Sequence, residues 1–162
     1  MKKTVFLFIA ALAATFTANA QEISNNAIGL RAGGGDGFGT EVTYQRLLSA
    51  NNRLEIDLGL ETDDAYDAFQ LAGIYQWVWN IDGGFNWYAG PGAGISFIDY
   101  DDDVFGDDDS SETALFLAGQ VGIEYNFDIP LLLSLDTRPA IYFGDNRDDL
   151  DFNIALGIKY QF

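Results

Sequence analysis

The sequence predicts an all-β protein, an eight-stranded antiparallel up-and-down transmembrane β-barrel. Two observations predict it: apolar residues recur at alternate positions through eight segments, and the connections between these segments alternate between short turns and acidic stretches. Alternation places the apolar side chains on one face of each strand, and about 9 to 11 residues suffice for a tilted strand to cross a bilayer. The expected strands are residues 26–34, 38–46, 53–61, 68–79, 85–98, 112–125, 131–143 and 150–162.

Residues 1–20 have the pattern of a cleaved secretory signal peptide. Lys2 and Lys3 precede a short apolar run, residues 5–14, and Ala18 and Ala20 form an A-x-A cleavage site. The apolar run is too short to span a bilayer as a helix. We therefore expect export, cleavage after Ala20, and one barrel domain over residues 21–162.

The first three expected strands carry charge on the less apolar face. Arg31 lies in the first strand and Glu41 in the second, both among glycine, threonine and other small or polar residues. The third strand, 53–61, has leucine and isoleucine on one face. Its other face carries Arg53, Glu55 and Asp57.

Small residues and two prolines distinguish the fourth to seventh strands. Gly90, Gly92 and Gly94 share the less apolar face of the fifth strand, where a narrow eight-stranded interior has little room. Pro91 and Pro139 fall on the opposite face, within the fifth and seventh strands. Proline removes a hydrogen-bond donor, so we expect local bulges or broken pairing at both positions.

The last strand, 150–162, alternates to the end of the chain. Its apolar face consists of Phe152, Ile154, Leu156, Ile158, Tyr160 and Phe162. This ending resembles the insertion signal of outer-membrane β-barrels, in which a terminal Phe follows apolar residues at alternate positions. The resemblance implies recognition by the barrel assembly machinery during insertion.

The connections give the barrel an expected orientation. Residues 47–52, 80–84 and 126–130 are tight-turn sequences, whereas residues 34–37, 62–67, 99–111 and 144–149 are acidic. Bacterial barrels place short turns in the periplasm and longer loops outside the cell. Aromatic residues gather near the strand ends, which is typical of the two membrane interfaces.

The composition of the less apolar face favours a membrane barrel over a soluble one. Glycine and alanine there suit a crowded interior, whereas a water-facing sheet would be weakened by glycine. Because a buried charge is costly without a partner, we expect interlocking ion pairs, although a proton or ion pathway is an alternative. With Glu61 and Asp151 counted, seven acidic residues face four basic ones, so some carboxylates should be hydrated. The expected network comprises Arg31, Glu41, Arg53, Glu55, Asp57, Glu124, Asp136, Arg138 and Lys159.

Composition excludes several functions. Twenty-five acidic residues against eight basic ones give a net charge of −17, which disfavours nucleic acid as a partner. The chain has no His and no Cys, so it cannot form a Ser-His-Asp relay or a thiol nucleophile. We expect no enzymatic activity and no cofactor.

The acidic stretch around residues 99–112 invites a metal interpretation. Asp101, Asp103, Asp107, Asp109 and Glu112 match positions one, three, seven, nine and twelve of a calcium loop. However, a phenylalanine occupies the fifth position, and strands are expected on both sides instead of helices. Three alternatives stay open: specific Ca²⁺ binding, weak divalent association that bridges neighbouring lipopolysaccharide, and a solvated loop.

By strand count, terminal strand and connection asymmetry, the chain resembles the small eight-stranded barrels of the OmpX and OmpA transmembrane type. The resemblance implies a surface protein of the outer membrane with a plugged interior, surrounded by lipid and lipopolysaccharide. It also implies a structural, adhesion or envelope-integrity role through acidic loops. OmpX-type barrels have protruding strands on the outer side, and here only the sixth strand and the long acidic loop leave room for that. A narrow channel for small cations or solutes and a soluble secreted ligand-binding barrel are the alternatives.

Overall fold

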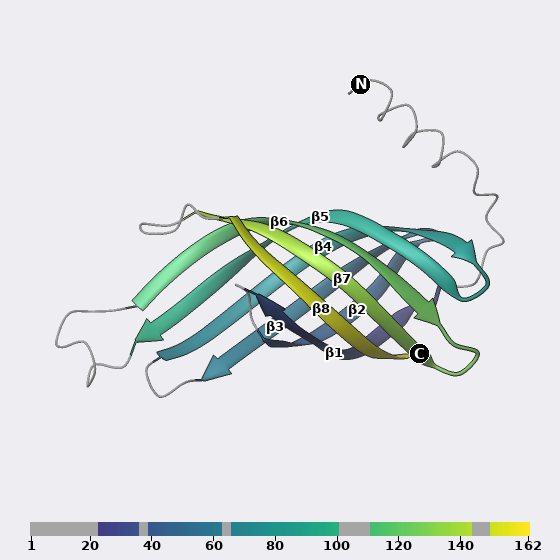
Figure 1. The fold of residues 1–162 in the computed structure, drawn as a ribbon, viewed down its shortest axis with the longest axis horizontal. Coiled ribbons are helices and arrows are strands. Elements are labelled where there is room, and N and C mark those ends of the chain that lie inside the picture. The colour runs from purple at the N-terminus through teal and green to yellow at the C-terminus, as the bar shows by residue number, and fades with distance from the viewer. Residues whose placement is uncertain (1–22, 36–38, 63–65, 101–110, 144–149) are drawn as a thin grey trace, which may run out of the picture.

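A computed structural model describes residues 23–35, 39–62, 66–100, 111–143 and 150–162. They form a closed barrel in which each strand pairs antiparallel with its neighbours in the chain and the first pairs with the last (Figure 1). The expected signal peptide lies outside the described residues. The strands are β1 (Asn26–Gly35), β2 (Thr40–Ser49), β3 (Asn52–Thr62), β4 (Tyr66–Asp82), β5 (Phe85–Tyr100), β6 (Ser111–Asn126), β7 (Leu131–Phe143) and β8 (Leu150–Gln161). Among these residues we find no helix long and apolar enough to span a bilayer.

The pairing of β1 with β8 closes the barrel. The register runs from Ala27 opposite Gln161 to Gly35 opposite Asn153. Beyond β8, the main chains of Asn26 and Phe162 exchange two hydrogen bonds of 3.0 and 2.9 Å between nitrogen and oxygen. The ladder therefore continues to the last residue and leaves no open edge there.

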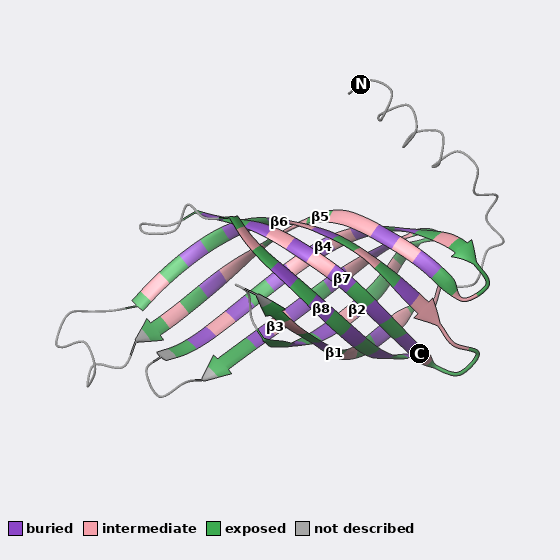
Figure 2. Ribbon diagram, viewed as in Figure 1, coloured by how far each residue is buried: buried purple, intermediate pink, exposed green. Residues whose placement is uncertain are grey.

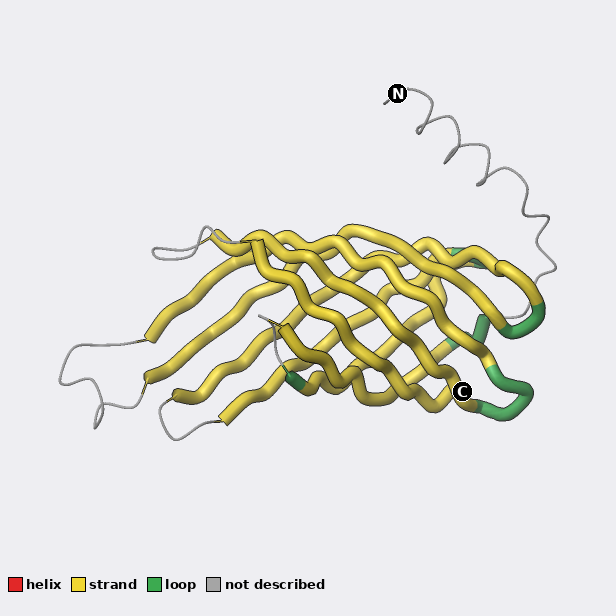
Figure 3. The backbone as a smooth tube through the Cα atoms, viewed as in Figure 1, coloured by secondary structure: helices red, strands yellow, loops and turns green. Residues whose placement is uncertain are grey.

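The two ends of the barrel differ, as the sequence predicts. Figure 3 shows the tight turns and the C-terminus at one end, which we call the turn end. The ends of β3, β5 and β7 lie at the other, which we call the loop end. Gly83 adopts a positive φ of 51° in the turn after β4, a conformation that glycine reaches without steric cost. Bulges occur at the turn end, between Leu47 and Ser49 and between Asn80 and Asp82.

Three neighbouring strands are longer than the rest. β4 has 17 residues and β5 and β6 have 16 each, against 10 in β1 and β2. Figure 1 shows the ends of β3 to β6 projecting together at the loop end, whereas residues 78–82 of β4 extend past β3 at the turn end. The sixth strand does project, but the expectation that only this strand and its loop leave room for projection was too narrow, because Thr62 of β3 lies opposite Asp67 of β4 and Asp99 of β5 lies opposite both Asp67 and Ser111 of β6.

Exposure alternates along the strands (Figure 2), and most of the large apolar side chains of the strands are at the exposed positions. Leu156 is 66% exposed and Ile154 is 63% exposed, in the middle of β8. Soluble monomers rarely expose a continuous apolar surface of this kind. The outer surface therefore requires lipid, which argues against the soluble alternative.

Both prolines interrupt pairing without shifting the register. The partners of β4 and β5 pass from Ile74 opposite Gly92 to Trp77 opposite Ala89, which skips Pro91. The β6–β7 ladder likewise skips Pro139, although each proline stays paired on its other side. The missing donor thus breaks pairing locally, and no bulge forms.

Aromatic side chains gather at the turn end. Trp79 and Trp87 stack with ring centroids 4.2 Å apart, and Tyr125 packs edge-on against both Phe85 and Phe127 at 4.6 Å. Rings with a polar edge suit the boundary between lipid and water. This cluster fits the expected belt on the side of the short turns.

Candidate functional site

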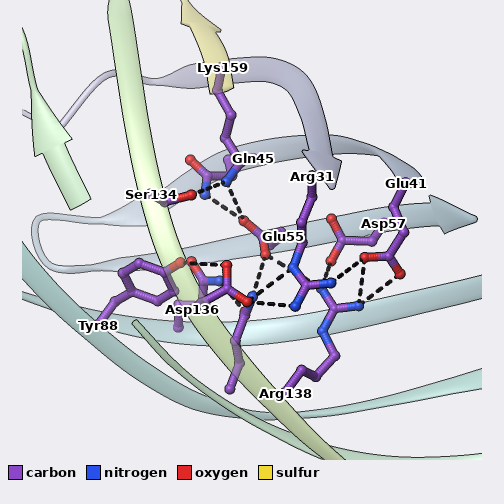
Figure 4. A network of polar contacts seen from close by, with 12 residues as sticks. Arg31, Glu41, Gln45, Glu55, Asp57, Tyr88, Ser134, Asp136, Arg138 and Lys159 are labelled. Atoms are coloured by element: carbon purple, nitrogen blue, oxygen red, sulfur yellow. Dashed lines mark hydrogen bonds and ion pairs between the residues drawn. The ribbon is translucent and has the colours of Figure 1, made fainter. Parts of the chain in front are cut away.

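The barrel interior is filled by a network of ion pairs. Arg31 donates from Nη1 to Glu41 Oε2 at 2.6 Å and from Nη2 to Asp136 Oδ1 at 2.6 Å. Arg138 donates to both carboxylate oxygens of Glu41 and to Asp57 (Figure 4). Because β1, β2, β3 and β7 supply these five side chains, the pairs tie opposite sides of the barrel together.

Glu55 is the centre of a second group of contacts. Its carboxylate lies 3.3 Å from Lys159 Nζ and accepts hydrogen bonds from the amides of Gln45 and Gln120, at 2.6 and 3.0 Å. Lys159 also lies 3.3 Å from the hydroxyl of Ser134. Glu55 is fully buried, so these donors replace the water that its charge would otherwise need.

Arg53 and Glu124 form a two-pronged pair, with nitrogen–oxygen distances of 2.6 and 3.1 Å. The Arg53 guanidinium also lies 4.9 Å from the ring centre of Tyr88, whose hydroxyl donates to Asp136 at 3.0 Å. The planar guanidinium matches a carboxylate in geometry. Through Tyr88, this pair is linked to the Arg31 group.

The structure brings all nine predicted network residues into contact with one another or with shared partners. The balance of charge differs from the expectation of seven acids to four bases. Glu61 is exposed and Asp151 is half-buried near the loop end. The buried set therefore has five carboxylates for four cations, so the interior is nearly neutral.

Sequence reasoning missed an apolar cluster inside the barrel. Ile74, Phe116 and Tyr142 pack there with inward alanines, and the rings of Phe116 and Tyr142 have centroids 5.0 Å apart. Inward glycines make room for these rings, since a Cβ on Gly94 would collide with Phe116. Ile74, Phe116 and Tyr142 occupy even-numbered positions, which face inward in β4, β6 and β7. This parity is the signal that could have identified the cluster.

The remaining predicted site residues belong to two groups, the terminal strand and the acidic stretch between β5 and β6. Ile154, Leu156, Ile158, Tyr160 and Phe162 all point outward and are exposed. Asp101, Asp103, Asp107 and Asp109 lie outside the described residues. Glu112 is described, half-buried at the start of β6. No group of three or more metal-ligating side chains occurs within the described ranges.

Comparison with known proteins rests on structure alone. No protein-family model matches the chain, and no curated protein matches its sequence. Neisserial surface protein A superposes with a TM-score of 0.62 at 12% identity, over 85% of this chain and 94% of that chain. The N-terminal barrel of Pseudomonas aeruginosa OprF gives 0.65 at 15% identity, over 86% and 100%. The chain has the fold of the small eight-stranded outer-membrane β-barrels.

A third barrel of this fold was solved with a ligand. Ail, the attachment invasion locus protein of Yersinia pestis, gives a TM-score of 0.53 at 18% identity, over 86% of this chain and 97% of that chain. Its structure is a complex with the heparin analogue sucrose octasulfate. At these identities, the shared property is the architecture.

Proposed function

We propose that this barrel is an outer-membrane surface protein with a plugged interior, whose acidic loop end contributes to envelope integrity or adhesion. The observation that carries the proposal is the filled interior. The ion pairs of Glu41 with Arg31 and Arg138 cross the interior. The apolar cluster around Phe116 fills a further part of it. A barrel without a free interior acts through its ends, and the loop end is the one that a surface protein presents to the outside.

The distribution of charge supports a role at the loop end. Of the basic residues that the structure describes, Arg46 alone lies outside the interior. Fourteen acidic residues belong to the four acidic connections, and Asp67 and Asp99 are the two among the described residues. In a lipopolysaccharide layer, divalent cations would bridge such carboxylates to the anionic lipid, which would stabilise the envelope.

The proposal includes the route to the membrane. The signal peptide of residues 1–20 directs export, and the outward apolar face of β8 is read by the barrel assembly machinery. The exposed Ile154, Leu156 and Phe162 support this reading, because a partner can reach them without opening the barrel.

A heat-shift assay on membrane fractions tests location and closure together. We expect the protein to sediment with outer membranes and to migrate faster on gels before boiling than after it, because a closed barrel resists detergent until heated. Protein that stays in the soluble periplasmic fraction would contradict the proposal. A strain without the protein should then be compared with its parent for sensitivity to a divalent-metal chelator and for attachment to surfaces.

A further inference from the structure

A small polar cluster interrupts the apolar outer surface of the barrel at the turn end. Arg46 of β2 lies opposite Asn26 of β1 and Leu54 of β3. The side-chain oxygen of Asn26 accepts hydrogen bonds from Arg46 Nη1 at 2.7 Å and from the Tyr44 hydroxyl at 2.9 Å. These two bonds hold the guanidinium in place on the exposed side of the sheet.

Arg46 differs from the other basic residues that the structure describes. Those residues are buried, and each pairs with a carboxylate inside the barrel: Arg31, Arg53, Arg138 and Lys159. Arg46 is exposed, and no carboxylate of the described residues forms an ion pair with it. A charge is costly in hydrocarbon, so an arginine on a lipid-facing surface needs an anion at the membrane boundary.

Aromatic neighbours place Arg46 near that boundary. Leu54 lies between Arg46 and Tyr75, in one row across β2, β3 and β4. Tyr75 packs edge-on against Trp77 with ring centroids 5.2 Å apart, and its hydroxyl accepts a hydrogen bond of 2.5 Å from the Asn52 amide. Tyrosine and tryptophan favour the level of the lipid headgroups. Lipid phosphate is the anion that a membrane supplies at this level.

We infer that Arg46 binds the phosphate of a phospholipid whose acyl chains lie along the apolar outer face of β2 and β3. The inference rests on the proposed function for its membrane setting, and it assigns the lipid to the periplasmic leaflet because short turns face the periplasm. A guanidinium can donate two parallel hydrogen bonds to a phosphate. Val42 and Ile56, which are 46% and 40% exposed, offer apolar surface to the acyl chains.

Native mass spectrometry of the full chain, refolded in a non-ionic detergent, tests the inference. The probe is phosphatidylglycerol, and the comparison ligands are a diacylglycerol with the same chains and glycerol phosphate without chains. We expect phosphatidylglycerol to bind best, because the site uses both the phosphate and the chains. Arg46→Gln should weaken its binding about tenfold, the loss of one hydrogen bond to a charged group. Arg46→Lys should lose less, since it keeps the charge without the two-pronged geometry.

The matched control is the double variant Arg46→Gln/Ser111→Arg, which restores the net charge at an exposed position at the loop end. It should bind phosphatidylglycerol as weakly as Arg46→Gln does. Parental affinity in the double variant would overturn the inference in favour of attraction to net charge. Equal affinity of the parent for the diacylglycerol would also overturn it, as would equal affinity for glycerol phosphate, which would indicate a site for free phosphate esters.

The heat shift of each variant verifies folding before lipid is added. A failure of lipid binding leaves the proposed membrane location standing, because that location is assayed in cells.

Discussion

At the scale of single residues, the interior is organised by shared partners more than by isolated pairs. Glu41 serves both Arg31 and Arg138, and Asp136 serves both Arg31 and Tyr88. Removing one member of a buried ion pair leaves the other charged and without compensation, which costs more than the pair contributes. Each arginine is therefore more important to stability than its individual bonds suggest.

Arg138→Met tests this sharing. Glu41 and Asp57 would lose their common donor, and we expect the free energy of unfolding to fall by about 3 to 5 kcal/mol. Urea unfolding of protein refolded in lipid vesicles measures the loss. Arg46→Met is the control, because Arg46 is exposed and its Nη1 donates to Asn26 Oδ1, at 2.7 Å, outside the interior network. A similar loss in both variants would show that arginine content, and not interior pairing, sets stability.

A pair of glycine substitutions tests the packing of the interior. A Cβ on Gly94 would meet Phe116 and the Leu71 carbonyl, whereas a Cβ on Gly73 meets nothing within 4 Å. Overpacking costs about 1 to 3 kcal/mol, so Gly94→Ala should lower stability by that amount and Gly73→Ala should not. Equal effects of the two substitutions in the same urea assay would contradict a tightly filled interior.

At the scale of elements, β8 and the extended strands β4 to β6 have separate tasks. β8 closes the barrel against β1 and carries an uninterrupted apolar outer face. The ends of β3, β4, β5 and β6 project together at the loop end, and a cleft lies there. β8 and these strands share the same alternation of inward and outward side chains. They differ in length and in their outer positions, which are apolar in β8 and include Asp67 and Asp99 at the loop end of β4 and β5.

Phe162→Ala tests the role of β8 in insertion. Phe162 is 59% exposed, and its contribution to the ladder comes from its main chain. We therefore expect less inserted protein in cells, measured as the heat-shifted fraction in outer membranes, with little change in the unfolding midpoint of the protein that does fold. Phe143→Ala removes a comparable lipid-facing ring, at 51% exposure, and should leave insertion unchanged. Equal insertion of both variants at the parental level would argue against a terminal signal.

At the scale of the whole molecule, the barrel separates two solvents. Lipid meets the outer apolar face, while charges, amides and the Phe116 cluster fill the interior. The interior is close to electrically neutral because five buried carboxylates meet four buried cations. A continuous water path for ions would have to break several of these contacts at once.

Planar-bilayer recording tests the plugged interior. We expect refolded protein to give no steady conductance above that of the detergent alone, because ion pairs and the Phe116 cluster occupy the cross-section. Steady cation-selective current would favour the channel alternative. Arg138→Met provides a second recording, and current that appears only in this variant would identify the network as the plug.

The strand count, the faces and the orientation of the connections were predictable from the sequence, because alternation is a local property of a strand. The interior ion pairs were predictable as a set, since buried charges need partners, but their pairing was not. Arg31 and Asp136 are far apart in the chain, and their contact depends on the shear of the closed barrel. The apolar cluster was missed because Ile74 and Phe116 have the same character as the residues that face lipid.

The sequence by itself determined a two-faced strand repeated eight times and a chain with acidic connections on one side. Only the tertiary structure decided which partners each buried charge has, that Glu61 and Asp151 lie outside the buried set, and that β3 to β6 form a cleft. The physical reason is that a face depends on neighbours in the chain, whereas a pair or a cleft depends on the register between strands and on the way the sheet closes.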